Sequence, residues 1–321
     1  MTDASLAAVL SLKDNMRREM SRVIEGQEDV SQHLLTALVA GGHVLLEGVP
    51  GVAKTLLVRS LAAALAVSFS RIQFTPDLMP ADILGVNVFD LRTSEFRFRP
   101  GPLFADVVLA DEINRAPAKT QAALLEAMQE KGLTIDGTTH ALSVLFTVVA
   151  TQNPVEYEGT YPLPEAQLDR FLMKILVDYP GADAEKAMLL KMHQLGEQAL
   201  NPAVAIQAVA SHEAILLARQ CAHQAEVDQA VLAYIVDIVR QSRTLPSLSL
   251  GASPRAGVML LQATKALATL RGKTYVTPDD VRELVFPVLR HRIKLTPEAE
   301  IEGLTPDTCL ASLLQHVTVP R

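Results

Sequence analysis

The run GVPGVAKT, residues 48–55, decides the fold of this chain. It follows an apolar run at residues 43–47 and precedes residues 54–67, where Ala and Leu recur at helical spacing. A glycine-rich turn between a strand and a helix directs several backbone N–H groups, and the positive end of the helix dipole, at one point. The sequence therefore predicts a phosphate-binding loop in an α/β fold.

Individual residues of this loop have distinct expected roles. Gly48 and Gly51 let the backbone approach a phosphate closely. Lys54 is expected to reach the β- and γ-phosphates of a nucleotide, and the Thr55 hydroxyl to ligate Mg²⁺. Ala53 replaces the glycine that usually precedes this lysine, so an ordinary strand-to-helix turn with an incidental Lys-Thr stays an alternative. The predicted nucleotide-binding positions of the loop are Gly48, Val49, Pro50, Gly51, Val52, Ala53, Lys54, Thr55 and Leu56.

A second motif, DVVLADE at residues 106–112, indicates a buried strand that ends in two adjacent carboxylates. Ligands bind at this carboxyl edge in open parallel sheets. Asp111 is expected to hold Mg²⁺ through its water shell, and Glu112, aimed differently, to polarise an attacking water. The alternative is that both residues cap a helix that begins near Pro117. The two motifs lie about 60 residues apart, each in its proper context, which favours a nucleotide site.

Asn153 ends the next strand pattern, VLFTVVATQN. An Asn before a proline, here Pro154, is ordinarily a turn residue. Because this strand pattern follows the Asp111 strand, Asn153 is also placed where a polar group can touch the γ-phosphate or its attacking water. Both interpretations stay open at this point.

The first half of the chain alternates β-rich apolar runs with helical patterns, which is typical of a parallel sheet with crossover helices. Two hairpins are predicted to interrupt it, at residues 86–99 and at residues 133–142 about Asp136-Gly137. Gly132 is expected to stop the helix before the second hairpin. The predicted strands are residues 43–47, 70–74, 106–111, 145–152 and 171–177, and the predicted helices between them include residues 54–67 and 118–130.

Helical patterns dominate after residue 181, where strand signals disappear. Ser253-Pro254 and Thr277-Pro278 each place a capping hydroxyl before a proline suited to the first helical turn, and Asp280 completes a capping box with Thr277. We therefore predict two domains, residues 1–180 and residues 181–321.

Composition excludes several classes of protein. Of the 321 residues, 49% are hydrophobic and 20% charged, which is the balance of an ordinary globular protein, and no apolar run is long enough for membrane insertion. The net charge of −7 argues against broad nucleic-acid binding, although Arg92, Arg97 and Arg99 cluster on one hairpin. The start of the chain lacks an export signal, and the two cysteines, Cys221 and Cys309, are too few for a disulfide framework. A cytoplasmic protein is expected.

The motifs together resemble those of the MoxR group of AAA+ ATPases, over nearly the whole chain. The stretches that carry this resemblance are GVPGVAKT, LADEINRAP at residues 109–117, TQNP at 151–154, LPEAQLDRF at 163–171 and GASPRA at 251–256. Ala53 is no anomaly beside this group, whose loops resemble GxPGxAKT. The resemblance implies an α/β P-loop NTPase (AAA+) core with a parallel sheet, a C-terminal all-α lid domain, ATP hydrolysis and Mg²⁺.

The resemblance also implies roles for polar residues outside the loop. Asn153 corresponds to the first sensor and Arg255 to the second sensor, at the start of a lid helix. Arg170 corresponds to the arginine finger that reaches the ATP site of an adjacent subunit, a role that chemistry supports because charge builds on the γ-phosphoryl oxygens. The alternatives are an exposed first-turn residue for Arg255 and, for Arg170, a surface salt bridge with Asp169 or Glu165. Arg115 is typical of the group, but whether it acts in cis or in trans stays open.

Two further features resemble parts of this group. Residues 23–27 are similar to the segment that lines the adenine pocket, where Ile24, Gly26 and Gln27 would contact the base. The two hairpins match insertions that usually face the channel of a ring, although edge strands or plain loops stay alternatives. The sequence shows no paired aromatic residues at a hairpin tip like those of peptide-threading relatives.

The expected assembly is a homo-oligomeric ring, a hexamer, because a head-to-tail interface that closes explains an ATP site and a finger on one chain. The resemblance implies a protein client with a von Willebrand factor A domain and a task in chaperone-like remodelling, maturation or metal insertion. The alternatives are a slowly hydrolysing nucleotide switch, which Glu112 disfavours, a nucleic-acid motor, which the net charge disfavours, and a small-molecule kinase, which gives no reason for Arg170.

Overall fold

The computed structural model describes residues 2–154, 159–195 and 206–320. Its centre is a five-stranded, fully parallel sheet in the order β2-β5-β8-β1-β9. The predicted strands are all present and shorter by up to two residues at an end, apart from β2, which is shifted by one residue. Their bounds are β1 Val44–Glu47, β2 Phe69–Gln73, β5 Val107–Asp111, β8 Thr147–Gln152 and β9 Met173–Leu176.

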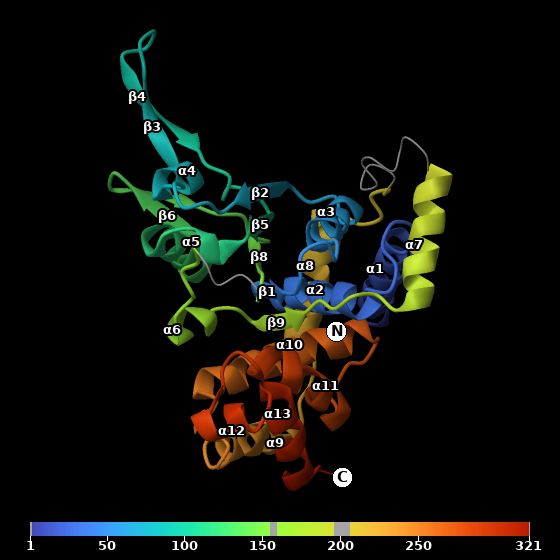
Figure 1. The fold of residues 1–321 in the computed structure, drawn as a ribbon. Helices are drawn as coiled ribbons and strands as arrows, with labels where there is room; N and C mark the ends of the chain where they lie inside the picture. The colour runs from blue at the N-terminus through green and yellow to red at the C-terminus, as the bar shows by residue number, and fades with distance from the viewer. Residues whose placement is uncertain (1, 155–158, 196–205, 321) are drawn as a thin grey trace.

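Helices cover both faces of this sheet, as Figure 1 shows, which explains why its strands are apolar on both sides. Successive residues alternate between faces, so Leu45 packs with one core cluster and Val44 and Leu46 with the other. The helices of this part are α1 Asp3–Met20, α2 Glu28–Ala40, α3 Lys54–Ala64, α4 Pro80–Leu84, the 3₁₀ helix η1 Ile113–Arg115, α5 Ala118–Glu130 and α6 Glu165–Leu168.

The start of β1 is fixed by a buried histidine. His43 Nε2 donates to the Met128 carbonyl of α5 at 3.1 Å, and His43 Nδ1 accepts the Val148 N–H of β8 at 2.9 Å. Both ring nitrogens are thereby used, which defines the neutral tautomer. The histidine ties together three elements that are distant in sequence.

The stop of helix α5 differs from the prediction. Lys131, with φ +50°, takes the left-handed position after the helix, and Gly132 begins the next strand instead. The prediction of Gly132 as the stop was therefore wrong. The chain needs a left-handed residue immediately after Glu130, before the hairpin can start.

Both predicted hairpins are present. The first is β3 Gly85–Asp90 with β4 Glu95–Pro100, and it extends well away from the body of the molecule (Figure 1). The second is β6 Gly132–Ile135 with β7 Thr138–Ala141, joined through Asp136 and Gly137, both with positive φ. Asn87 Nδ2 donates to Asp136 Oδ2 at 2.6 Å, so the two hairpins are joined near the second turn.

The first hairpin does carry paired aromatic residues, so the expectation that it has none was wrong. Phe89 and Phe96 are register partners one position from the turn, and their ring centroids lie 5.2 Å apart. Phe96 is 73% exposed. The antiparallel register sets residues that are seven apart opposite each other, which a search for adjacent aromatics does not detect.

The C-terminal part is helical apart from one short strand pair. Ser253 caps α10 through the Ala256 N–H, and Thr277 and Asp280 form the predicted capping box of α11. An extended link precedes α7, at the predicted boundary near residue 180, which stays a prediction. The elements are α7 Ala182–Leu195, α8 His212–Gln224, α9 Gln229–Gln241, β10 Leu248–Leu250, α10 Pro254–Leu270, α11 Pro278–Leu289, β11 Lys294–Leu295, α12 Pro297–Ile301 and α13 Pro306–His316.

One apolar core cluster runs from helix α1 to the C-terminal helices, with Val9 and Val317 among its members. The helices α8 and α10 pack against α1 and α2, so the lid rests directly on the sheet-bearing part. Among the described residues, no helix is both long and apolar enough to cross a bilayer.

Candidate active site

The phosphate loop connects β1 to α3, in the context that the sequence predicts. A Cβ at Gly48 would lie 2.3 Å from the Val177 carbonyl oxygen, so only glycine fits beside the end of β9. The Gly48 N–H donates to the Gln152 carbonyl at 3.4 Å, which ties the loop to β8. The loop is therefore held between the two neighbours of β1.

Ala53 has a left-handed backbone, with φ +59° and ψ +25°, immediately before the first residue of α3. Alanine in this region costs about 1–2 kcal/mol, and such strain is concentrated at functional sites. Ala53, which replaces the usual glycine, is thus a strained residue. Lys54 Nζ donates to the carbonyls of Gly48 and Val49, the latter at 3.4 Å, so its ammonium is directed into the loop.

Asp111, at the end of β5, is 8% exposed and fully engaged. The Thr151 hydroxyl of β8 donates to its Oδ1 at 2.6 Å, and the Thr55 hydroxyl of α3 to its Oδ2 at 3.3 Å. Arg71 of β2 adds two bonds to Oδ2, from Nε at 3.1 Å and from one terminal nitrogen at 2.6 Å. The burial of this carboxylate is thus compensated by an ion pair and hydrogen bonds.

Glu112 has a left-handed backbone with φ +56°, a second strained position at the same edge. Its N–H donates to the Thr151 hydroxyl at 2.9 Å, which fixes the backbone. Its carboxylate accepts from Gln73 Nε2 at 2.7 Å and pairs with Arg115 Nε at 3.1 Å. The idea that Asp111 and Glu112 cap the next helix was wrong, since α5 begins after Pro117 without a side-chain cap.

A pocket of about 410 Å³ lies at this edge of the sheet. Asn153, 7% exposed, lines it together with Glu112 and the loop. The structure thus brings together the predicted phosphate-binding, metal-binding, water-polarising and first-sensor residues. The lining residues are Pro50, Gly51, Ala53, Lys54, Thr55, Leu56, Asp111, Glu112, Thr151 and Asn153.

The donor set of this pocket fits Mg²⁺. A hydroxyl and a carboxylate oxygen lie 3.3 Å apart, and hard oxygen ligands from one or two side chains plus phosphate oxygens are what Mg²⁺ usually takes. In the described parts of the chain, no group of three or more His, Cys, Asp or Glu is arranged to hold a metal ion without help. A cation at Thr55 and Asp111 would complete its shell with water or with phosphate oxygens of a nucleotide.

Arg170 follows α6 and precedes β9, away from the pocket of its own chain. The two carboxylates considered as its partners are taken by others: Asp169 pairs with Arg292 at 2.7 Å and Glu165 with Lys294 at 2.8 Å. Within the described residues Arg170 has no ion pair, so the surface salt bridge is not formed. We call residues 165–174 the finger segment.

The other predicted arginines are placed differently. Arg115 pairs with Glu112 of its own chain, so the structure shows a contact in cis. Arg255 is exposed on the first turn of α10 and does not line the phosphate pocket. The structure therefore does not bring Arg255 to the phosphate loop.

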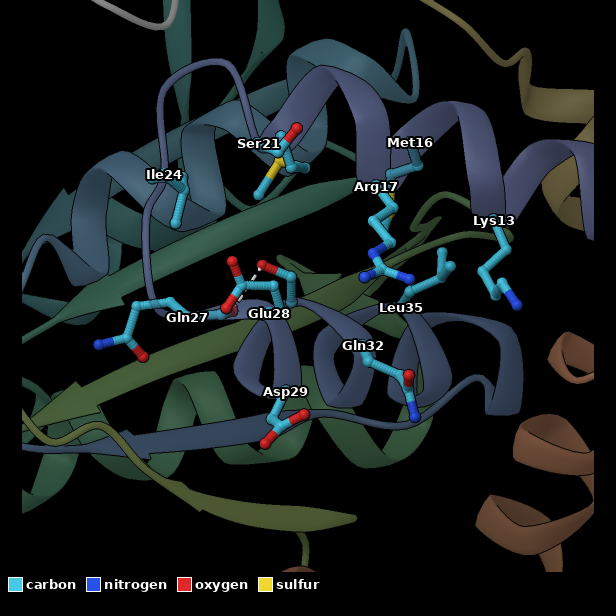
Figure 2. Close-up of a pocket in the computed structure, with 12 residues that line it drawn as sticks. Lys13, Met16, Arg17, Ser21, Ile24, Gln27, Glu28, Asp29, Gln32 and Leu35 are labelled. Atoms are coloured by element: carbon cyan, nitrogen blue, oxygen red, sulfur yellow. Dashed lines mark hydrogen bonds between the residues drawn. The ribbon is translucent and has the colours of Figure 1, made fainter. Parts of the chain in front are cut away.

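The residues predicted for the adenine pocket lie near the phosphate loop but not in its pocket. Ile24 and Gln27 line a separate pocket of about 280 Å³ between α1 and α2, at the opposite end from Lys13 (Figure 2). Gln27 Nε2 donates to the Asp178 carbonyl at 2.9 Å, next to the residue that touches Gly48. Gly26, with φ +69°, is covered by the start of α7.

Sequence reasoning missed Arg71, Gln73 and Thr151. Arg71 donates to Gln73 Oε1 at 2.9 Å, so a chain of bonds runs from Asp111 through these two residues to Glu112. A signal was present, because Arg71 and Gln73 are polar residues two apart in an otherwise β-rich run and so share a face of the strand. Thr151 gave no comparable signal, since threonine is common in strands.

The comparisons with known proteins match this geometry. The model of the ATPase family associated with various cellular activities (AAA) matches residues 43–173, and the model of the AAA lid domain matches residues 240–312. The protein Chaperone MoxR1 of Mycobacterium tuberculosis is 42% identical, over 98% of this chain and 84% of its own length. The chain belongs to the MoxR group of AAA+ ATPases. It is an ATP hydrolase with a nucleotide-binding core and a helical lid.

Other relatives extend over the same length. YeaC of Bacillus subtilis is 46% identical over 94% of this chain and 92% of its own, and Protein MoxR of Methylorubrum extorquens is 30% identical over 99% and 98%. A crystal structure from Cytophaga hutchinsonii, whose protein carries a provisional ATPase name, matches with a TM-score of 0.90 at 39% identity, over 99% and 97% of the two chains. These matches therefore extend over both the core and the helical lid.

Proposed function

We propose that this MoxR-group ATPase hydrolyses Mg-ATP at the phosphate pocket, with Glu112 as the residue that polarises the attacking water. The observation that carries this assignment is the strained Glu112 backbone at the mouth of a pocket that also holds Lys54, Asp111 and Asn153. Lys54 would leave the loop carbonyls for the β- and γ-phosphates. Asn153 would orient the water, and Gln73 would hold Glu112 until nucleotide is bound.

Thr55 and Asp111 are the proposed metal ligands. Mg²⁺ bound there supplies neutralising charge for the β- and γ-phosphate oxygens. Arg71 pairs with the Asp111 carboxylate, so a cation bound there would compete with this guanidinium. Ile24, Gly26 and Gln27 are proposed to contact the adenine, on the ground that Gln27 is bonded beside the strand end that supports Gly48.

We further propose that Arg170 acts in trans, as the finger of a ring, and that the ring is a hexamer. Its support is the placement of Arg170 away from its own pocket, with both neighbouring carboxylates paired elsewhere. An arginine supplied by a neighbour stabilises the charge on the departing γ-phosphoryl group. Arg255 is proposed as the second sensor, which would require the lid to move towards the phosphates.

The proposed task is remodelling of a client protein in the cytoplasm. The name of the relative Chaperone MoxR1 supports a chaperone task. A client with a von Willebrand factor A domain, and maturation or metal insertion as the outcome, follow from the family resemblance. The first hairpin, with Phe89, Phe96 and its arginines exposed, offers a surface for such a client.

The test of a shared site is ATP hydrolysis per subunit across a range of protein concentration, with mass by light scattering. We expect the specific rate to rise as rings form. Arg170→Ala should reduce kcat by about 10³-fold, while Arg282→Ala, on an exposed lid arginine, should not. A rate independent of concentration, together with normal turnover in Arg170→Ala, would instead support a self-sufficient monomer.

A further inference from the structure

The finger segment is bound by a row of donors from the lid. Residues 290–294 follow helix α11, and we call them the donor row. Four of them, Arg290, His291, Arg292 and Lys294, bond to the finger segment through their side chains. The contacts that frame it are Arg290 to the Lys174 carbonyl at 3.2 Å, His291 Nε2 to the Phe171 carbonyl at 3.0 Å and Lys294 to the Glu165 carboxylate at 2.8 Å.

Arg292 is the centre of this row and is 6% exposed. Its Nε donates to Asp169 Oδ1 at 2.7 Å, and its terminal nitrogens donate to the carbonyls of Asp169 and Leu172, both at 3.2 Å, and of Phe171. A buried guanidinium requires this degree of hydrogen bonding and pairing. Asp169 and Phe171, which lie on either side of Arg170, are thus both bonded to the Arg292 side chain.

The same guanidinium also contacts the lid itself. It donates to the Val288 carbonyl of α11 and touches the Met259 sulfur of α10. Met259 lies one helical turn after Arg255, on the same face of α10. Burial lowers the pKa of Arg292 to about 10, Asp169 opposes that shift, and the charge of Arg255 adds to it. Arg292 therefore lies between the proposed second sensor and the proposed finger.

The donor row also keeps Arg170 available. Arg292 takes the carboxylate of Asp169, and Lys294 takes that of Glu165. These are the carboxylates of the finger segment nearest in sequence to Arg170, and with both engaged it is not drawn onto its own surface.

We propose that Arg292 is a positioning residue that couples the lid of one subunit to the finger that this subunit presents to its neighbour. When nucleotide draws Arg255 and helix α10 to a new position, Arg292 carries the movement to Asp169 and Phe171. The occupancy of one ATP site then sets the position of the Arg170 finger at the next site. This inference rests on the proposed action of Arg170 in trans.

The first test compares Arg292→Lys with Arg271→Lys. Arg271 also joins α10 to α11, by pairing with the buried Asp280 at 2.8 Å, but does not touch the finger segment. We expect Arg292→Lys to lower kcat by about 10- to 100-fold, because a finger displaced by about 1 Å loses most of its effect, while the Kd for ATP changes by less than twofold. Arg271→Lys should leave both within twofold.

A positioning role requires that Arg292 act through Arg170. In an Arg170→Ala background, Arg292→Lys should therefore lower kcat by no more than about twofold. A further reduction of kcat by about 10- to 100-fold in that background would overturn the inference. If Arg292→Lys does not fold, Asp169→Asn removes the same ion pair with a near-isosteric side chain and is expected to show the same dependence on Arg170.

Mixed rings give the direction of the coupling. Subunits with Glu112→Gln provide a finger but no turnover, and subunits with Arg170→Ala provide a site but no finger, so mixing should restore hydrolysis. Arg292→Lys should lower the recovered rate by about 10- to 100-fold when placed in the finger-providing subunit and not when placed in the site-providing one. Equal loss of recovery for both placements of Arg292→Lys would overturn the inference about Arg292 but not the action of Arg170 in trans. No recovery in the parent mixture would instead refute the action of Arg170 in trans.

Discussion

The phosphate pocket and the finger segment hold the charged residues of one proposed reaction, but they are built in different ways. In the pocket, Asp111 ends one strand and Lys54 and Asn153 follow two others, and parallel pairing sets these strands side by side. The finger segment is a single helical turn and an edge strand, fixed by side chains such as Arg292, which bonds a carbonyl 120 residues away. Backbone pairing thus places the first group of residues, and side-chain contacts place Arg170.

The largest effect is expected from removing the base at the phosphate pocket. Glu112→Gln keeps the bonds from Gln73 and the backbone but loses the charge that polarises water, so kcat should fall by about 10²- to 10⁴-fold. Binding of ATP, measured with a fluorescent analogue, should stay within about threefold. A variant that still turns over at the parent rate would show that Glu112 does not polarise the attacking water.

Lys54→Ala should instead weaken ATP binding at the same pocket. A charged contact to phosphate is worth about 1.5–3 kcal/mol, so the Kd for ATP should rise by about 10- to 100-fold or more. Arg170→Ala is the matched variant in the finger segment, and it should lower kcat with little change in Kd. Similar Kd changes in both variants would contradict the division between binding in cis and catalysis in trans.

Two buried histidines, His43 at the start of β1 and His291 beside the finger segment, make the stability of the fold sensitive to acid, and His43 gives the measurable case. Burial lowers its pKa to about 4, whereas in the unfolded chain it is about 6.5. Its contribution to stability is therefore complete above pH 6.5 and is lost as pH falls towards 4, by about 3 kcal/mol in total. Burial also lowers the pKa of His291, beneath the finger segment, well below its ordinary value.

Urea unfolding between pH 7 and pH 4.5 measures this effect. In His43→Gln the loss of stability over that range should be smaller than in the parent chain, although the variant is less stable at pH 7. The exposed His316→Gln serves as the control and should retain the full acid dependence. Identical slopes for all three proteins would show that His43 does not titrate as described.

The smallest effect is expected at Arg71, which occupies the carboxylate proposed to hold Mg²⁺. Because its side chain is half exposed, its pairing with Asp111 is worth about 0.2–1 kcal/mol. Arg71→Ala should therefore lower the Mg²⁺ concentration needed for half-maximal ATP binding by about two- to fivefold. A higher requirement would mean that Arg71 helps to hold the metal site rather than competing for it.

The same contrast explains what could be predicted from the sequence. The sheet, the loop, the Asp111-Glu112 pair and both hairpins have local patterns, and the structure has all of them. Gly132 and the Phe89–Phe96 pair were misjudged because a helix stop and a strand register depend on single-residue offsets. Arg292 and Arg71 were missed because their partners are distant in the chain. No spacing rule in the sequence predicts which carboxylate or carbonyl a guanidinium will bind.

The pairing order of the sheet also bears on how the protein is made. Val44 of strand β1 pairs with Val149 and with Met173, so neither neighbour exists when β1 leaves the ribosome. At about 5–20 residues per second, the wait for Met173 is on the order of ten seconds, with an apolar strand unpaired throughout. Sheets of distant parallel strands are also slow to fold. We therefore expect the sheet to form only after most of the sheet-bearing part has been synthesised.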